Sequence, residues 1–465
     1  MRRQRVSGGP SIGLVTIALL VMEAGAAGQS LAQELPHPRG MGFTEVQIQI
    51  PDTARFEFRL ANGLTGFAVQ DPRMPLVQIS AFIRVGTGDA NKRGVAEVLA
   101  MLLRRGPCWM GPNRFREAMD RMAGKLTIVM TRNMTEITLN IPTEDAAQGI
   151  RIFSGIIRAP CIEQDGLEEF RRRGVSAPTP PVDAVVENGS LELAVDLFNR
   201  RLFEGHRYSE VITSEDAAAI TIEDVEDFHW DFFSPGNMVL AVSGAFDAGA
   251  LLSEVDQRFA DWETRRLPRL RTESDVRTPP RATYRYRSDK LQTWIVIGHE
   301  LPRVSPDDLP ALQVMNYILG GGHFDTRLFR EARDKRGLTN DASGFLEFNL
   351  RGPGTYTFRT YGRHEVAQQL IDLTFAEIER IRSELVSEEE LLVAKGALTD
   401  GEFAMKFANG HAVARTFAQE LARYGMFRHL LGYVRRVRSI SREDVRRAAQ
   451  RYLHPERMAV VIVGR

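Results

Sequence analysis

The sequence predicts an α+β fold of two homologous domains, each a mainly antiparallel or mixed β-sheet with helices packed on one face. The main observation is an internal repeat with a constant offset of 220 residues. The segment Ile220–Val225 recurs as Ile440–Val445, and Met238–Gly244 recurs as Met458–Gly464. Two copies of one pattern indicate a tandem duplication rather than a solenoid, which stacks more repeats.

The local chemistry of the two copies agrees. Thr221 and Ser441 are favourable helix caps, and Asp224 or Asp444 follows at the third helical position. In each copy a proline ends the helix, and a buried apolar strand follows. A proline- and arginine-rich stretch without periodicity separates the copies. The chain therefore divides into a signal peptide at 1–32, an N-terminal domain at 45–262, a linker at 263–284 and a C-terminal domain at 285–465.

The elements of the first half follow from their periodicity. Alternating apolar residues predict strands, and the Asn62-Gly63 pair predicts a hairpin turn between the first two. A helical stripe predicts a helix that Gly106 ends. The second half repeats strand, helix, two strands and several helices. The predicted ranges in the first half are strands around 56–60, 65–69, 77–85, 126–130 and 136–141, and helices at 95–103 and 115–123.

The composition is that of an ordinary globular protein. Of 465 residues, 43% are hydrophobic and 26% are charged, which excludes a disordered, collagen-like or multi-span membrane protein. Lysine plus arginine and aspartate plus glutamate both number 60, so the charge balance indicates no nucleic-acid partner.

The first residues are typical of a secretory signal peptide. Arg2, Arg3 and Arg5 precede an apolar stretch at 12–22 that is too short to span a bilayer. Ser30-Leu31-Ala32 fits a cleavage site, and Ala24-Gly25-Ala26 is a second candidate. We expect a periplasmic protein with no membrane contact after cleavage. The alternative is an uncleaved membrane anchor.

The chain has two cysteines, Cys108 and Cys161, each directly after a proline. Two cysteines exclude a disulfide scaffold and a four-cysteine zinc site within one chain. In an oxidising compartment the pair could form a disulfide. Two unpaired buried thiols are an equal alternative, because sequence gives no Cα separation.

Several irregular motifs, in order and in both halves, resemble the pitrilysin/insulinase-type zinc peptidases, which include the mitochondrial processing peptidases. The resemblance covers nearly the whole chain after the signal peptide. The motifs in the first half are Leu60–Leu64, Val85–Asp89 and Leu202–Tyr208, and those in the second are Asn316–Gly322, Asp325–Phe329 and Arg333–Leu338.

The resemblance implies a helix with His-x-x-Glu-His, whose histidines bind zinc while the glutamate acts as general base. Here Glu97, Ala100 and Met101 stand for the first histidine, the glutamate and the second histidine. The region of the third ligand, 176–186, has Asp183 as its only carboxylate. We read Glu97 as a solvated helix carboxylate, and we expect no metal and no catalytic residue in this chain.

The histidines lead to the same expectation independently of the family. The closest two of the nine, His411 and His429, are 18 residues apart, so no helical turn presents two imidazoles. A zinc site assembled from distant residues remains a less favoured alternative.

In the second half the resemblance implies an arginine and a tyrosine that contact the substrate main chain. Arg333 matches the arginine, and Asn340 stands at the tyrosine position. An ion pair of Arg333 with Glu331 or Asp334 is an equal alternative. The run Gly320, Gly321 and Gly322 resembles the glycine-rich loop that handles substrate in non-catalytic subunits of the family. The alternative is a helix end followed by a sharp turn. His323 is a candidate for the rim of that loop.

The resemblance thus implies a catalytically inactive subunit that pairs with a zinc-bearing homologue and completes a chamber for peptide substrates. Zinc is expected in the partner. Two rivals remain: a stand-alone module that binds peptides by strand addition, and a purely structural subunit like those of a respiratory complex. An active enzyme with a relocated site is the least favoured alternative.

Overall fold

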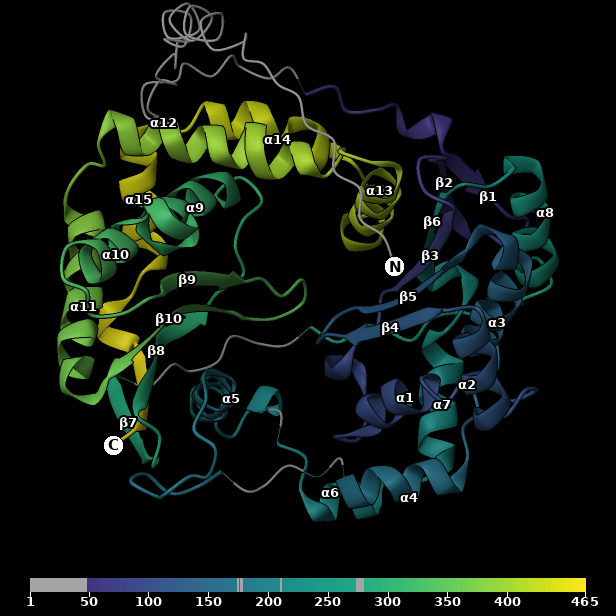
Figure 1. Cartoon of the computed structure of the whole chain (residues 1–465), viewed down its shortest axis with the longest axis horizontal. Coiled ribbons are helices and arrows are strands. Elements are labelled where there is room, and N and C mark those ends of the chain that lie inside the picture. The colour runs from purple at the N-terminus through teal and green to yellow at the C-terminus, as the bar shows by residue number, and fades with distance from the viewer. Residues whose placement is uncertain (1–47, 174, 176–178, 210, 273–279) are drawn as a thin grey trace, which may run out of the picture. The chain divides into compact units, whose positions relative to one another are not determined.

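Two β-sheets carry the fold, one from each half of the chain (Figure 1). The computed structural model describes residues 48–465 except 174, 176–178, 210 and 273–279, so the predicted signal peptide lies outside the described residues. Ile48–Arg465 forms one compact unit. The division at 263–284 stays a prediction, because part of that segment is outside the described residues.

The first sheet has the order β1-β2-β6-β3-β5-β4, with β2 and β6 parallel and the other pairs antiparallel. The predicted strands are confirmed, and the Asn62-Gly63 turn joins β1 to β2 with Gly63 at φ +86°. The bounds are β1 (Glu57–Arg59), β2 (Thr65–Gln70), β3 (Leu76–Ile83), β4 (Lys125–Met130), β5 (Thr135–Pro142) and β6 (Met238–Gly244).

The second sheet has the same strand order as the first, except that it has no counterpart of the edge strand β1. Its order is β7-β11-β8-β10-β9, and its single parallel pair, β7 with β11, corresponds to β2 with β6. The identical order confirms the duplicated α+β plan. The bounds are β7 (Ala282–Arg287), β8 (Gln292–Leu301), β9 (Ala342–Glu347), β10 (Gly354–Arg363) and β11 (Ala459–Gly464).

The repeated caps form as expected. Before α7 (Ile222–Phe232), the Thr221 hydroxyl accepts a hydrogen bond from the Asp224 N–H at 3.2 Å, and the Asp224 carboxylate accepts from the Thr221 N–H at 2.8 Å. Ser441 and Asp444 make the same reciprocal pair before α15 (Arg442–Tyr452). These boxes satisfy N–H groups that have no partner within the helix. Strands β6 and β11 follow, and both are buried.

Each half covers one face of its own sheet with helices, as predicted. In the first half, α2 begins at Pro112 rather than near 115, since proline suits the first helical position. The helices are α1 (Val95–Leu103), α2 (Pro112–Arg121), α3 (Ala146–Arg158), α4 (Gln164–Arg173), α5 (Leu191–Leu202), α6 (Ser214–Ala219), α8 (Ala248–Phe259), α9 (Leu309–Asn316), α10 (Arg327–Phe329), α11 (Ala367–Ser383), α12 (Glu388–Gly396), α13 (Gly410–Tyr424) and α14 (Arg428–Arg438).

The opposite face of each sheet receives a helix from the other half. Helix α13 packs on β2, β3 and β6, where Phe417 lies 5.7 Å from Phe67 between ring centroids. Helix α5 packs on β8 and β11, where Phe198 shares a core with Val296 and Val461. Alternate strand residues therefore enter different cores, which is why the central strands read as continuous apolar runs. Sequence patterning did not indicate this exchange.

Polar contacts also join the two halves. Both guanidinium Nη atoms of Arg351 donate to the Asp89 carboxylate at 2.7 Å, and the Asp89 side chain is 1% exposed. Arg415 of α13 makes a similar two-pronged contact with Glu136 of β5, at 2.9 and 2.7 Å. Paired guanidinium–carboxylate geometry fixes orientation as well as distance, so these contacts set how the halves meet.

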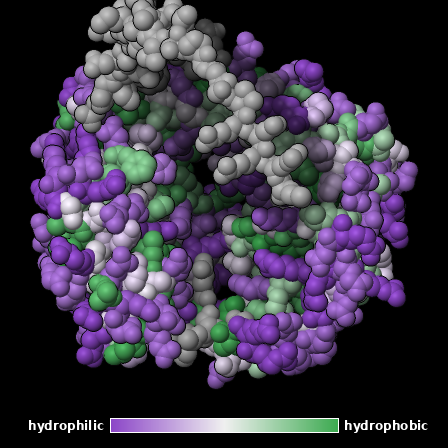
Figure 2. All heavy atoms as spheres, in the orientation of Figure 1, coloured by the Kyte–Doolittle hydropathy of each residue, from purple (hydrophilic) through white to green (hydrophobic). Residues whose placement is uncertain are grey.

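The described residues include no helix that is both long and apolar enough to cross a membrane. The face in view in Figure 2 is mainly hydrophilic, with apolar side chains in scattered groups.

Candidate functional site

Helix α1 carries the three positions that correspond to the zinc motif. It begins after Gly94, whose backbone is left-handed at φ +92°. Any residue with a Cβ at this position would clash with the Ile220 side chain. Glu97 and Met101 lie one helical turn apart on one face. Met101 packs against the first core, and Ala100 is buried. The three positions that correspond to the zinc motif therefore carry one carboxylate, one methyl group and one thioether.

A cavity of about 240 Å³ lies beside Glu97, which is half-buried and is its single acidic lining residue. Its cationic lining comes from four different segments of the chain. A cationic wall of this kind opposes the binding of a metal cation through charge repulsion. The arginines are Arg93, Arg132, Arg207 and Arg271.

Contacts hold these arginines at the wall. The Arg207 Nη2 donates to the Ala90 carbonyl at 2.8 Å, and Arg271 donates to the Asn91 side chain at 2.8 Å. The Arg132 guanidinium lies 4.4 Å from the Tyr208 ring centroid. No sequence spacing relates these residues, so sequence reasoning had no signal for the cavity.

Asp183 lies beside the second sheet. Its backbone N–H donates to the Arg285 carbonyl at 2.7 Å, and three residues later the Val186 N–H donates to the Arg287 carbonyl at 2.7 Å. The segment therefore pairs with β7. The Asp183 side chain is exposed, its backbone is left-handed at φ +66°, and residues 176–178 of the predicted third-ligand region lie outside the described residues.

In the second half, Gly320 and Gly321 belong to a π-helical turn at Tyr317–Gly321 that continues α9. A Cβ on Gly320 would come within 2.8 Å of the Gly344 nitrogen, and one on Gly321 would meet the Asn316 amide. The left-handed residue that follows this helical turn is His323, at φ +56°. Close packing, rather than a left-handed backbone, is what requires glycine here.

The same turn lines a cavity of about 310 Å³ with Gly320, Gly321 and His323. Its other wall is β9, the edge strand of the second sheet, with the partly exposed Phe345 close by. Burial raises the pKa of Tyr317, and the nearby charges of Glu402 and Asp325 add to this. The cavity thus joins an apolar rim to polar groups at a sheet edge. Further lining residues that sequence reasoning missed are Gln313, Ser343, Leu346, Phe348, Leu398 and Glu402.

Arg333 and Asn340 are exposed, and neither they nor Gly322 line this cavity. The Arg333 guanidinium stacks 4.8 Å from the Phe329 ring centroid. Glu331, its proposed ion-pair partner, instead accepts hydrogen bonds from Lys335 and Arg336, both at 2.5 Å. The structure therefore brings together Gly320, Gly321 and His323, and leaves the arginine on a neighbouring surface.

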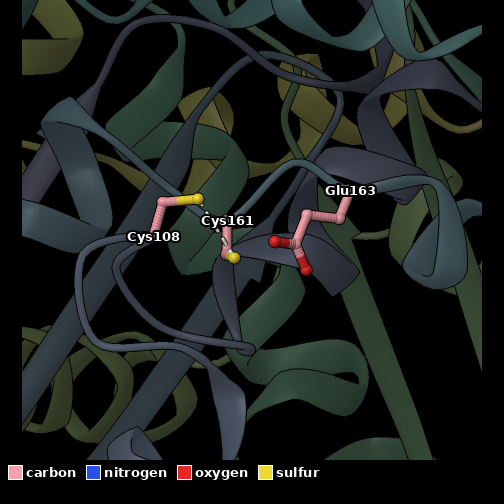
Figure 3. A group of neighbouring side chains, drawn as sticks. All are labelled: Cys108, Cys161 and Glu163. Carbon is pink, nitrogen blue, oxygen red and sulfur yellow. Dashed lines mark hydrogen bonds between the residues drawn. The ribbon is translucent and has the colours of Figure 1, made fainter.

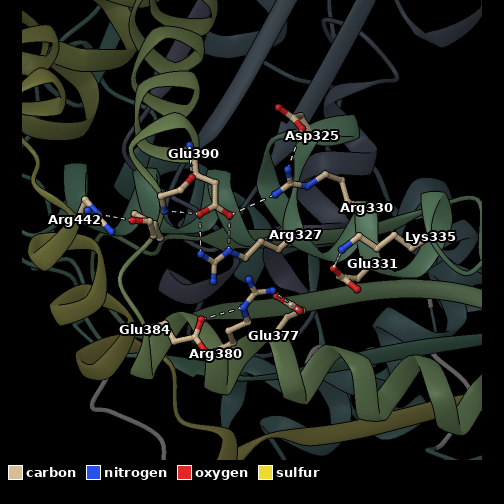
Figure 4. Close-up of polar contacts among 12 residues, drawn as sticks. Asp325, Arg327, Arg330, Glu331, Lys335, Glu377, Arg380, Glu384, Glu390 and Arg442 are labelled. Carbon is tan, nitrogen blue, oxygen red and sulfur yellow. Dashed lines mark hydrogen bonds and ion pairs between the residues drawn. The ribbon is translucent and has the colours of Figure 1, made fainter. Parts of the chain in front are cut away.

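Arg327 and Glu390 form a largely buried ion pair near this region of the chain (Figure 4). Arg327, whose side chain is 4% exposed, donates to both carboxylate oxygens of Glu390 at 2.7 and 2.8 Å. Burial alone would raise the pKa of Glu390. Hydrogen bonds from Arg327 and the Ser387 N–H, with the charges of Arg327 and Arg330, instead lower the pKa to about 2. The pair fixes α12 to α10, which follows the glycine-rich turn.

Comparisons with known proteins agree with this architecture. Residues 219–398 match the family described as "Peptidase M16 inactive domain". Over 415 residues, the chain is 23% identical to an uncharacterized zinc protease of Mycobacterium tuberculosis, covering 84% of this chain and 89% of that protein. It is 22% identical over 423 residues to the mitochondrial-processing peptidase subunit beta of Blastocladiella emersonii, covering 87% and 88%.

The fold also matches a crystal structure of a peptidase M16 inactive domain from Pseudomonas fluorescens. The TM-score is 0.70 at 18% identity, with 88% of this chain and 97% of that chain covered. Residues 219–398 therefore match the inactive domain of M16 peptidases, the whole chain is similar in sequence and fold to M16-type zinc peptidases, and its helix α1 lacks the His-x-x-Glu-His motif.

Proposed function

We propose that the protein is a catalytically inactive peptidase subunit that pairs with a zinc-bearing homologue. One observation carries the proposal: Glu97, Ala100 and Met101 occupy the positions of two zinc ligands and the general base. Zinc in such a site needs three protein ligands and an activated water. These positions supply only one potential ligand, the Glu97 carboxylate, in a cavity lined by arginines, which does not fit that requirement.

The partner supplies the metal in this proposal, and this chain binds none. Among the described residues, the one group of three potential metal ligands is Cys108, Cys161 and Glu163, and α1 contributes none of them. The similarity to a protein named as one subunit of a processing peptidase favours a two-chain arrangement. The signal-peptide pattern at 1–32 supports a periplasmic location for the complex in this proposal.

The substrate in this proposal is a peptide that contacts the cavity beside β9. An edge strand presents unpaired backbone groups, so an extended peptide can pair with it. Gly320, Gly321 and Gly322 form the turn at this edge, and Arg333 and Asn340 lie on the surface beyond it. The balanced charge of the chain gives no support for a nucleic-acid ligand.

Co-expression with a motif-bearing homologue from the same genome tests the proposal. We expect a stable heterodimer that holds about one zinc and cleaves peptides, whereas the isolated chain holds no stoichiometric zinc and is inactive. The control is a partner whose motif glutamate is replaced by glutamine, which should assemble without cleaving. One zinc per isolated chain would overturn the proposal, as would the absence of any complex.

Substitution of Gly321 separates peptide contact from a purely structural role. In the assembled complex, Gly321→Ala should lower peptide cleavage roughly tenfold, because the new methyl group displaces the Asn316 side chain from the cavity wall. Gly396→Ala is the matched control, since a Cβ there meets nothing within 4 Å. Unchanged cleavage in Gly321→Ala and Arg333→Ala would favour the alternative, a structural or assembly subunit. Peptide binding without a partner would favour a stand-alone binding module.

A further inference from the structure

Two loops of the first half of the chain bring both cysteines together (Figure 3). One loop follows α1 and the other follows α3. The Cys108 N–H donates to the Ala159 carbonyl at 3.0 Å, and the Cys161 N–H donates to the Gly106 carbonyl at 3.1 Å. The two Sγ atoms lie 3.2 Å apart, and the Glu163 carboxylate is within 4.8 Å of both.

The two thiols are chemically unequal. Cys108 is exposed, whereas Cys161 is 1% exposed. Burial, followed by hydrogen bonds with Cys108 and Glu163, raises the pKa of the Cys161 thiol to about 12. Since the thiolate is the nucleophile in thiol–disulfide exchange, an external reagent should react first at Cys108.

We propose that Cys108 and Cys161 form a reversible disulfide that is entered at Cys108 and closed by Cys161. The oxidant is a disulfide-bearing molecule, either a small disulfide or an oxidoreductase. The Cys108 thiolate attacks one of its sulfurs, and the other sulfur leaves as a thiolate. Cys161 then gives its proton to the Glu163 carboxylate and attacks the Cys108 sulfur, which expels the second thiolate. Two protein thiols are oxidised, and one external disulfide is reduced to two thiols.

The geometry favours a disulfide over a metal site. Two thiolates on one tetrahedral zinc, each about 2.3 Å from the metal, sit about 3.8 Å apart. The observed 3.2 Å is shorter, and closure needs only a further approach to about 2.05 Å. Within the described part of the chain, the cluster offers three ligands rather than the four of a structural zinc site. The bond would tie the end of α1 to the loop before α4.

Titration of the full chain with reduced and oxidised glutathione, followed by alkylation and mass analysis, tests the proposal. We expect the wild type to lose both thiols together and to gain no glutathione. Cys161→Ser should stop as a glutathione adduct on Cys108. Cys108→Ser should react about a hundredfold more slowly at Cys161, because that thiol is buried. Equal rates in the two variants would overturn the proposal. Stoichiometric zinc that protects both thiols would overturn it as well.

Glu163→Gln tests the proton acceptor. We expect closure to slow about tenfold near neutral pH, while the rate of adduct formation at Cys108 stays unchanged. The difference in closure rate should shrink at high pH, where hydroxide removes the Cys161 proton. A Glu163→Gln variant with an unchanged closure rate and pH profile would remove Glu163 from the proposal. This experiment reports on thiols alone, so its result is independent of the proposed partner and substrate.

Discussion

Phe417→Ala should lower the free energy of unfolding by about 4 kcal/mol, because it removes a large side chain from a filled core. Phe417 is 0% exposed, and its ring centroid lies within 6.4 Å of those of Phe56, Phe67, Phe407 and Phe427. It belongs to α13, yet it packs on the sheet of the other half. Denaturant unfolding followed by fluorescence and circular dichroism measures the loss.

Phe324→Ala is the matched control, since the same atoms are removed from a ring that is 72% exposed. We expect that change to cost less than about 1 kcal/mol. Phe417→Ala should shift the unfolding of the whole chain as one transition, because α13 and α5 join the two sheets. Separate unfolding of the first sheet would contradict this account of the exchanged helices.

Arg327→Met should cost about 3 kcal/mol, because it leaves the Glu390 carboxylate without its two-pronged partner. Exposed ion pairs contribute far less, but the Glu390 side chain here is only 16% exposed. Loss of the guanidinium should also raise the pKa of Glu390 from about 2 toward or above its ordinary value. Denaturant titrations at several pH values measure both effects.

The sign of the pH dependence follows from the lowered pKa. Glu390 titrates at about 2 in the folded chain and near 4.5 when unfolded, so its stabilisation is complete above pH 4.5 and is lost as the pH falls toward 2. The advantage of wild type over Glu390→Gln should shrink in that window. The double variant Arg327→Met, Glu390→Gln should recover part of the loss. A stability difference that is constant from pH 5 to 3 would contradict the assignment.

Sequence pattern predicted most of the fold because its information is local. Alternating residues such as those of 77–85 have their own strand signature, and Thr221 and Ser441 carry the reciprocal caps that mark the repeat. The sheet on which each helix packs could not be predicted in the same way. An amphipathic helix such as α13 shows that one face is buried, but its sequence does not say against which sheet.

The candidate site was predictable only where it follows a motif. The family resemblance located Glu97, Ala100 and Met101 on one predicted helix, and α1 contains all three. Arg93 is close to Glu97 in the sequence, but Arg132, Arg207 and Arg271 come from distant segments that tertiary folding brings to the same cavity. The glycine run predicted a helix end followed by a turn, but its sequence did not show that the left-handed residue is His323. The cysteines are 53 residues apart in sequence, which left their separation open until the loops were seen to pair.

The exchange of α5 and α13 has a consequence for synthesis on the ribosome. Strand β11, at 459–464, lies inside the second sheet, and α5 packs against it although α5 emerges more than two hundred residues earlier. In the first sheet, Phe67 and Val239 are covered only after α13 has been synthesised and has packed on them. One apolar face of the first sheet and the apolar face of α5 therefore stay uncovered until most of the second half has been made. A nascent or truncated product exposes this apolar surface, which chaperones and proteases recognise.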